Sequence, residues 1–240
     1  MKKYIIALAC MIILLTGCTY RQEVVERDTE TDTIHMSTGA DGIKRPELTQ
    51  TLAVKGEDFS LTCTYDLGNY NLSEWRVTDS KNVGMSVKTK DLPSGYEVYI
   101  DHVHADIVLK STSTQIDGIT QDSMDDTYHG ISQDGFYIDD DSEYYNIFSI
   151  EGYTNQFYEL WGYAFGNFGT MSSNYKKLTE GNIQKCGTYA EKLIVVYDLS
   201  IKKPGTNKFY TKSVISEMLI PVSGDIKTQE VDVLTGNPTK

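Results

Sequence analysis

The sequence predicts an all-β fold: an antiparallel β-sandwich, immunoglobulin-like in the broad sense, that carries one short helix. Two observations lead to this prediction. From Leu48 onward the chain contains short runs in which apolar and polar residues alternate, as they do in half-buried strands. Turn sequences rich in glycine, asparagine and proline separate these runs. Many short strands joined by such turns are typical of sandwiches.

The alternating runs are, in chain order, residues 59–65, 75–78, 83–88, 96–110, 135–139, 144–152, 193–201 and 213–222. Residues 79–82 have turn composition, so we expect them to join the second and third runs as a hairpin. Residues 203–207 contain Pro204 and Gly205, and they are predicted to connect the last two runs in the same way.

One stretch has the period of a helix instead of a strand. Phe157, Leu160, Trp161 and Ala164 recur at spacings of three and four residues. Thr154 is placed to cap the first turn of this stretch. We therefore expect a short helix after Thr154.

The N-terminus predicts export and lipidation. Lys2 and Lys3 precede an almost wholly apolar run, residues 4–15, and small residues lead up to Cys18. This is the layout of a secretory signal, and the run is shorter than the ~20 residues that a membrane-spanning helix needs. Residues 15–18 resemble the lipobox of bacterial lipoproteins. The resemblance implies cleavage before Cys18 and attachment of a diacylglyceryl group to its sulfur.

On this basis the chain divides into three parts. Residues 1–17 are predicted to be the lipoprotein signal peptide, 18–46 a lipidated, disordered tether and 47–240 the β-sandwich domain. The tether is rich in threonine and charged residues and has almost no apolar periodicity. We expect the lipid to hold the mature protein on the extracytoplasmic side of the cell membrane.

The charge balance narrows the possible partners. The chain carries 34 acidic and 22 basic residues, and loss of Lys2 and Lys3 with the signal leaves 20 basic ones. A surface with this balance repels phosphate groups, which argues against nucleic-acid binding through a basic face. Cations and basic protein surfaces remain suitable partners.

Two cysteines, Cys63 and Cys186, remain after the signal peptide and Cys18 are set aside. An exported compartment permits a disulfide between them. Two buried cysteines without a disulfide are the alternative.

Residues 101–106 suggest a metal site. Residues two apart on a strand share a face, so His102, His104 and Asp106 are predicted to point together. Two imidazoles and a carboxylate are suitable ligands for zinc or copper, and His129 could complete the set. The alternative is a polar sheet face directed at solvent.

A second candidate site is acidic. Carboxylates that lie close together on loops can supply the oxygen ligands that calcium prefers, although the spacing of an EF-hand is absent. Solvated loops explain the same residues without an ion. The residues concerned are Asp117, Asp122, Asp125, Asp126, Asp134, Asp139, Asp140, Asp141 and Glu143.

Aromatic residues are concentrated between Phe136 and Phe168. Exposed tyrosine and tryptophan side chains would form a contact surface for a protein or a glycan, because they supply large contact area at little entropy cost. Buried, the same side chains would form the core. The residues assigned to partner contact are Tyr144, Tyr145, Tyr158, Trp161 and Tyr163.

The sequence contains none of the specific catalytic motifs, such as Gly-x-Ser-x-Gly or His-Glu-x-x-His, and it predicts a protein that is not an enzyme. Residues 102–107 and 121–130, with the lipobox, resemble the small lipoproteins encoded among the transfer genes of Gram-positive conjugative plasmids and integrative elements. The resemblance implies an accessory role in or beside a type IV secretion apparatus. The predicted function is therefore non-catalytic binding of another envelope protein. The alternative is a metal- or glycan-binding surface module.

Overall fold

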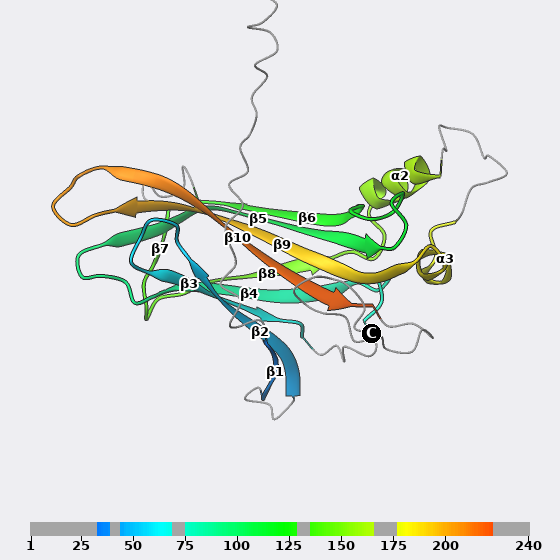
Figure 1. Cartoon of the computed structure of the whole chain (residues 1–240), viewed down its shortest axis with the longest axis horizontal. Helices are drawn as coiled ribbons and strands as arrows, with labels where there is room; N and C mark the ends of the chain where they lie inside the picture. The colour runs from blue at the N-terminus through cyan, green and yellow to red at the C-terminus, as the bar shows by residue number, and fades with distance from the viewer. Residues whose placement is uncertain (1–32, 39–43, 69–74, 129–134, 166–176, 223–240) are drawn as a thin grey trace, which may run out of the picture.

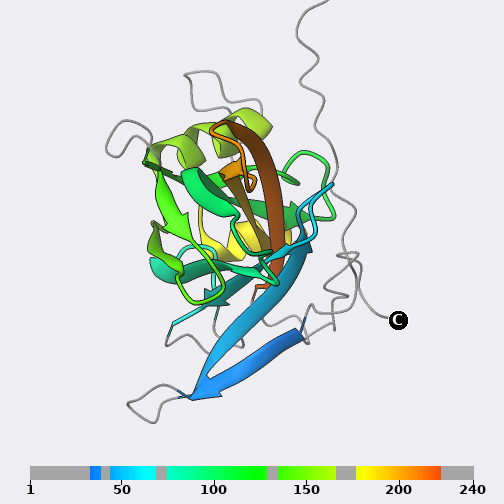
Figure 2. The ribbon, with the colours of Figure 1, turned by 90° about the vertical axis from the view of Figure 1, so that its left-hand side faces the viewer.

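The computed structural model describes residues 33–38, 44–68, 75–128, 135–165 and 177–222, and it consists mainly of two antiparallel sheets stacked face to face (Figures 1 and 2). Sheet A has the strand order β1-β2-β3-β4-β8. Sheet B has the order β10-β9-β5-β6, and the short strand β7 pairs with the start of β5. The predicted all-β sandwich is confirmed.

The strands are β1 (Thr33–Thr38), β2 (Lys44–Ala53), β3 (Ser60–Asp66), β4 (Lys81–Lys90), β5 (Glu97–Ser111), β6 (Thr120–Thr127), β7 (Phe136–Ile138), β8 (Tyr144–Ile150), β9 (Thr188–Lys202) and β10 (Phe209–Pro221). Strands β9 and β10 form the predicted hairpin around Gly205, whose φ of 75° suits a tight turn. The sequence does not predict β6, because this edge strand is mostly polar and lacks a regular alternation.

Alternate residues of both sheets face one continuous core. In β3, Leu61, Cys63 and Tyr65 are buried, while the residues between them are partly exposed. Strand β9 has the same period over most of its length, and the buried residues of the two sheets belong to a single cluster. Both sheets therefore pack around the same core.

The β1–β2 hairpin extends away from the body of the sandwich (Figure 2). It lies partly inside the range 18–46, for which the sequence predicts a disordered tether. That prediction is wrong for Thr33–Thr38 and for residues 44–46, which pair in antiparallel register. Strand β1 forms backbone hydrogen bonds with β2, and β2 is itself paired with β3. Backbone hydrogen bonds of this kind do not require an apolar periodicity in the sequence. Residues 1–32, with the predicted signal peptide and Cys18, lie outside the described residues.

Residues 75–78 do not form the predicted strand, and the hairpin expected at 79–82 is also wrong. The backbone groups of residues 75–78 form hydrogen bonds with side chains instead of with a neighbouring strand. Lys81 Nζ donates to the Arg76 carbonyl oxygen at 2.5 Å, and the Glu180 carboxylate accepts from the Thr78 N–H at 3.0 Å. These contacts satisfy the backbone without a sheet.

Among the described residues, two helices, α2 (Asn155–Ala164) and α3 (Glu180–Lys185), accompany the sheets, where the sequence predicts one. Helix α2 is the predicted helix, and its expected cap is confirmed: Thr154 Oγ1 accepts a hydrogen bond from Phe157 N at 3.0 Å. Thr179 caps α3 in the same way. In the described part of the chain, no helix has the length and apolar character needed to cross a membrane.

The helices cover a second, smaller core cluster at one end of the sandwich (Figure 1). Cys186 belongs to this cluster and Cys63 to the first one, and no disulfide joins them. Burial raises the pKa of the Cys63 thiol to about 12, so the thiol stays protonated at neutral pH.

Thr154 fixes the start of α2 through two hydrogen bonds, because its Oγ1 also donates to the Gln121 carbonyl oxygen at 2.5 Å. We expect Thr154→Ala to lower the free energy of unfolding by about 1–2 kcal/mol, measured by urea denaturation. Thr154→Ser keeps the hydroxyl group and is the control. An equal loss in both variants would show that the methyl group, rather than the two hydrogen bonds, is responsible.

Candidate functional site

An array of imidazole and carboxylate side chains lies across the outer face of sheet B. His102 and His104 project from β5, and Asp125 projects from the neighbouring edge strand β6, where the register pairs it with His104. The Oδ1 atom of Asp125 lies 2.9 Å from His102 Nε2 and 2.9 Å from His104 Nδ1. The structure therefore places the two histidines on one face, as the spacing on a strand predicts.

The other nitrogen of each imidazole also faces a carboxylate. His102 Nδ1 lies 3.1 Å from Asp198 Oδ2, which projects from β9. His104 Nε2 lies 3.1 Å from Asp106 Oδ2, two residues further along β5. Each imidazole is therefore held between two carboxylates, and the two imidazoles share Asp125.

Both outer carboxylates are themselves held in place by serines. Ser213 Oγ on β10 donates to Asp198 at 2.5 Å, and Ser123 Oγ on β6 donates to Asp106 at 2.6 Å. The array thus joins all four long strands of sheet B. The two imidazole side chains are 32% and 34% exposed, so solvent has access to them.

The carboxylates raise the pKa of both histidines. Partial burial by itself lowers the pKa of His102, but hydrogen bonds to Asp125 and Asp198 outweigh it. For His104, partial burial is likewise outweighed by hydrogen bonds to Asp125 and Asp106. In return, the hydrogen bonds from His104 and His102 hold the pKa of the Asp125 carboxyl below its ordinary value. The array therefore favours positive charge at the imidazoles.

The structure changes the set of residues predicted to bind metal. Asp106 lies on the predicted face, but it contacts the far side of His104. The third group between the imidazoles is Asp125, which the sequence places only among the candidate calcium ligands. Within the described residues, His102, His104 and Asp125 are the one group of three or more His, Cys, Asp or Glu side chains whose ligand atoms converge, all within 4.8 Å. His129 lies outside the described residues.

Two of the acidic residues considered for calcium, Asp117 and Asp139, bind separate local donors. Asp117 forms an ion pair with Lys110 at 2.6 Å and accepts from the Ser111 N–H. Asp139 Oδ1 accepts from two backbone N–H groups of the following turn. Asp134 lies outside the described residues. The contacts of Asp117 and Asp139 stabilise loops and strand ends without an ion.

Exposed apolar side chains are concentrated in the segment from β8 to α2. Tyr145 and Ile147 point outward from β8 and are 59% and 47% exposed. Tyr153 and Tyr158 are also exposed, and their rings stack with centroids 5.8 Å apart. Tyr163, near the end of α2, is 56% exposed. Three of the residues predicted to contact a partner, Tyr145, Tyr158 and Tyr163, therefore lie on the surface.

The other two, Tyr144 and Trp161, are fully buried, so their assignment to partner contact is wrong. Strand alternation directs Tyr144 into the core, where its hydroxyl donates to Asp126 at 2.8 Å. Helical spacing places Trp161 beside Phe157 on the buried face of α2, with ring centroids 6.4 Å apart. Both side chains stabilise the fold.

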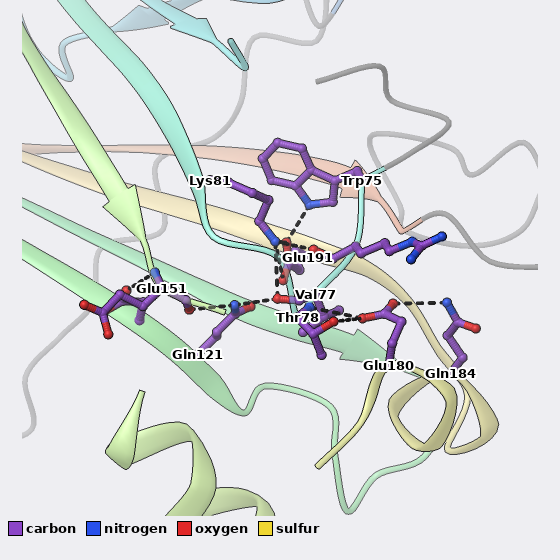
Figure 3. A network of polar contacts seen from close by, with 11 residues as sticks. Trp75, Val77, Thr78, Lys81, Gln121, Glu151, Glu180, Gln184 and Glu191 are labelled. Atoms are coloured by element: carbon purple, nitrogen blue, oxygen red, sulfur yellow. Dashed lines mark hydrogen bonds and ion pairs between the residues drawn. The ribbon is translucent and has the colours of Figure 1, made fainter. Parts of the chain in front are cut away.

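A second group of ionisable side chains, which the sequence does not predict, is buried near α3 (Figure 3). Lys81 on β4 and Glu191 on β9 form an ion pair of 3.1 Å, and neither side chain is exposed. Trp75 Nε1 donates to the same Glu191 oxygen at 2.5 Å, and Lys81 Nζ lies 4.7 Å from the centroid of the Trp75 ring. Burial raises the pKa of Glu191, and this effect exceeds the opposing effects of Lys81 and Trp75. Because β4 and β9 belong to different sheets, the pair joins the two layers.

Polar contacts continue from this ion pair toward β6 and α3 (Figure 3). Gln121 Nε2 donates to the carbonyl oxygens of Val77 and Glu151, at 2.8 and 3.0 Å. Glu180 accepts from both the N–H and the hydroxyl of Thr78, at 3.0 Å each. A ligand has no access to the buried ion pair, so this network stabilises the fold and is not a binding site.

The described residues define the class of this protein: a two-sheet antiparallel β-sandwich with a histidine–carboxylate array on one outer face and exposed aromatic side chains at β8 and α2. No protein-family model matches the sequence, and no curated protein is significantly similar to it.

Proposed function

We propose that this protein is a lipid-anchored, non-catalytic binding protein on the extracytoplasmic side of a bacterial membrane. Its partner is another envelope protein, and its role is that of an accessory to a conjugative transfer (type IV secretion) apparatus. The lipobox residues that end at Cys18 support the anchor. The exposed aromatic side chains from β8 to α2 support the binding role, and this observation carries the proposal.

Helix α2 shows why these side chains favour a partner. Phe157 and Trp161 fill the core side of the helix, while Tyr158 and Tyr163 lie on its other side and are 45% and 56% exposed. Aromatic residues are enriched at protein interfaces, where they bury large area at little entropy cost. The acidic surface of the chain favours a partner with basic groups around the contact.

A photoreactive amino acid placed at position 145, 158 or 163 in intact cells tests the binding role. We expect each of these positions to capture the same envelope protein, identified by mass spectrometry. Position 137 is the matched control, because Tyr137 is 40% exposed and lies on β7, at the opposite end of the sandwich from α2 (Figure 1). Capture of different abundant proteins at every position, the control included, would contradict a specific contact.

Two variants separate the anchor from the partner contact. We expect Cys18→Ser to release the protein from the membrane fraction, and Tyr158→Ser combined with Tyr163→Ser to leave it anchored but without its cross-linked partner. In donor cells that lack the native protein, wild type should restore DNA transfer and both altered forms should not. Specific capture with unchanged transfer would retain the binding role and reject the role in conjugation.

A further inference from the structure

We propose that His102, His104 and Asp125 form a binding site for a divalent transition-metal ion of the zinc type, with Asp198 and Asp106 as the carboxylates that orient the two imidazoles. This inference is independent of the partner contact at β8 and α2.

The distances suit a metal ion between the three side chains. A zinc ion lies about 2.0–2.1 Å from imidazole nitrogen, which sets neighbouring ligand atoms of a tetrahedral site roughly 3.3 Å apart. His102 Nε2 and His104 Nδ1 each lie 2.9 Å from Asp125 Oδ1. The three ligand atoms lie within 4.8 Å of one another, so metal binding needs the two imidazole nitrogens at roughly 3.3 Å from each other and Asp125 moved outward. The Asp125 side chain is 63% exposed on an edge strand and has room for this movement.

The carboxylates around the imidazoles also favour positive charge at this point. Four contacts join ring nitrogens to carboxylate oxygens, and two protonated imidazoles supply the four N–H groups that these contacts need. A metal ion between His102, His104 and Asp125 supplies that positive charge in place of the two protons that face Asp125 Oδ1. The two remaining N–H groups still donate to Asp198 and Asp106.

The outer carboxylates supply the support that metal-binding histidines ordinarily have. A histidine ligand usually donates its other N–H to a carboxylate, which fixes the orientation of the ring and raises its basicity. Asp198 and Asp106 stand in this position, and each accepts a hydrogen bond from a serine hydroxyl. A polar face turned to solvent does not require this arrangement around both imidazoles.

The ligands indicate the type of ion. Imidazole nitrogen suits zinc, copper and nickel, whereas calcium and magnesium prefer sites made of oxygen alone. Three protein ligands on an accessible sheet face leave the fourth position to water or to a group from another molecule. The ion would also cross-link β5 to the edge strand β6, because the histidines and Asp125 come from different strands.

The test uses the lipidated full chain, purified without a polyhistidine tag, stripped with chelator and titrated with zinc chloride by calorimetry. We expect one zinc ion per chain, a higher melting temperature and slower amide exchange in β6. His104→Gln and Asp125→Ala should abolish these effects, and Asp198→Asn should weaken zinc affinity by about 10–100-fold. Glu217→Gln removes a carboxylate from another strand of sheet B, outside the array, and should leave zinc affinity unchanged.

Three results would overturn the inference: no zinc binding, binding that persists in both His104→Gln and Asp125→Ala, or an equal loss of affinity in Glu217→Gln. The melting temperature of each variant in chelator shows whether it folds. The exposed Asp125 provides a second test if His104→Gln proves unstable.

Discussion

Lys81→Met is expected to lower the free energy of unfolding by about 3–5 kcal/mol, because it leaves the Glu191 carboxylate buried without its cation. Glu191 would keep the hydrogen bond from Trp75, while the carbonyl oxygen of Arg76 would lose the ammonium donor. Chemical denaturation of the variant and of the wild type measures the difference.

Two comparisons make this prediction specific. Lys192→Met breaks an ion pair of similar length with Glu217, 2.7 Å, but both partners are partly exposed, so we expect a change within about 1 kcal/mol. Lys81→Met combined with Glu191→Gln removes the buried charge and should be more stable than Lys81→Met alone. If the double variant were as unstable as the single one, the loss would come from packing and not from the unpaired charge.

The Lys81→Met effect should also depend on pH. Burial raises the pKa of Glu191, and the substitution removes a group that opposes this rise. A carboxyl whose pKa is raised in the folded state stabilises the fold while it is protonated, and that stabilisation disappears as the pH rises through the folded pKa. The variant should therefore lose less stability at about pH 5 than at about pH 8.

Trp161→Ala is expected to lower the free energy of unfolding by about 3–5 kcal/mol, since it empties the centre of the second core cluster. Trp161 is fully buried between α2 and the end of the sandwich. Tyr158→Ala, on the exposed side of the same helix, is the matched control and should change stability by no more than about 1 kcal/mol.

Tyr158→Ala and Trp161→Ala should affect different properties, the first binding and the second stability. Tyr158→Ala should weaken capture of the partner while the protein stays folded. Trp161→Ala should destabilise the protein without removing a contact residue. If the Trp161→Ala protein kept its stability but lost its partner, Trp161 would be a contact residue after all.

The sequence predicts those elements whose signal is local. Helix α2 follows from the spacing of Phe157 and Trp161 and from a threonine that can cap it. The shared face of His102 and His104 follows from the two-residue period of a strand. In both cases, residues close in the chain determine the outcome.

The elements that the sequence does not predict depend on contacts between segments, which the spacing of residues within one segment does not reveal. Asp125 lies beside the imidazoles because β6 pairs with β5 in this register. The spacing of residues along one strand carries no information about that register. Residues 75–78 have the alternation of a strand, yet Lys81 and Glu180 bond their backbone and displace a sheet partner. The β1–β2 hairpin forms in a polar segment because β3 already holds β2.

The pairing of β5 with β9 has a consequence for synthesis of the chain. These two strands pair along nearly their full lengths, although β6, β7, β8 and both helices lie between them in the sequence. The chain emerges from its N-terminus during synthesis and export, so the strands of sheet A are available before β9, with part of their apolar face uncovered. Closure of the sandwich is therefore among the last events of biogenesis. A chain that stalls before residue 188 would hold all of sheet A but lack β9 and β10 of sheet B, and it would present the uncovered core to chaperones and proteases.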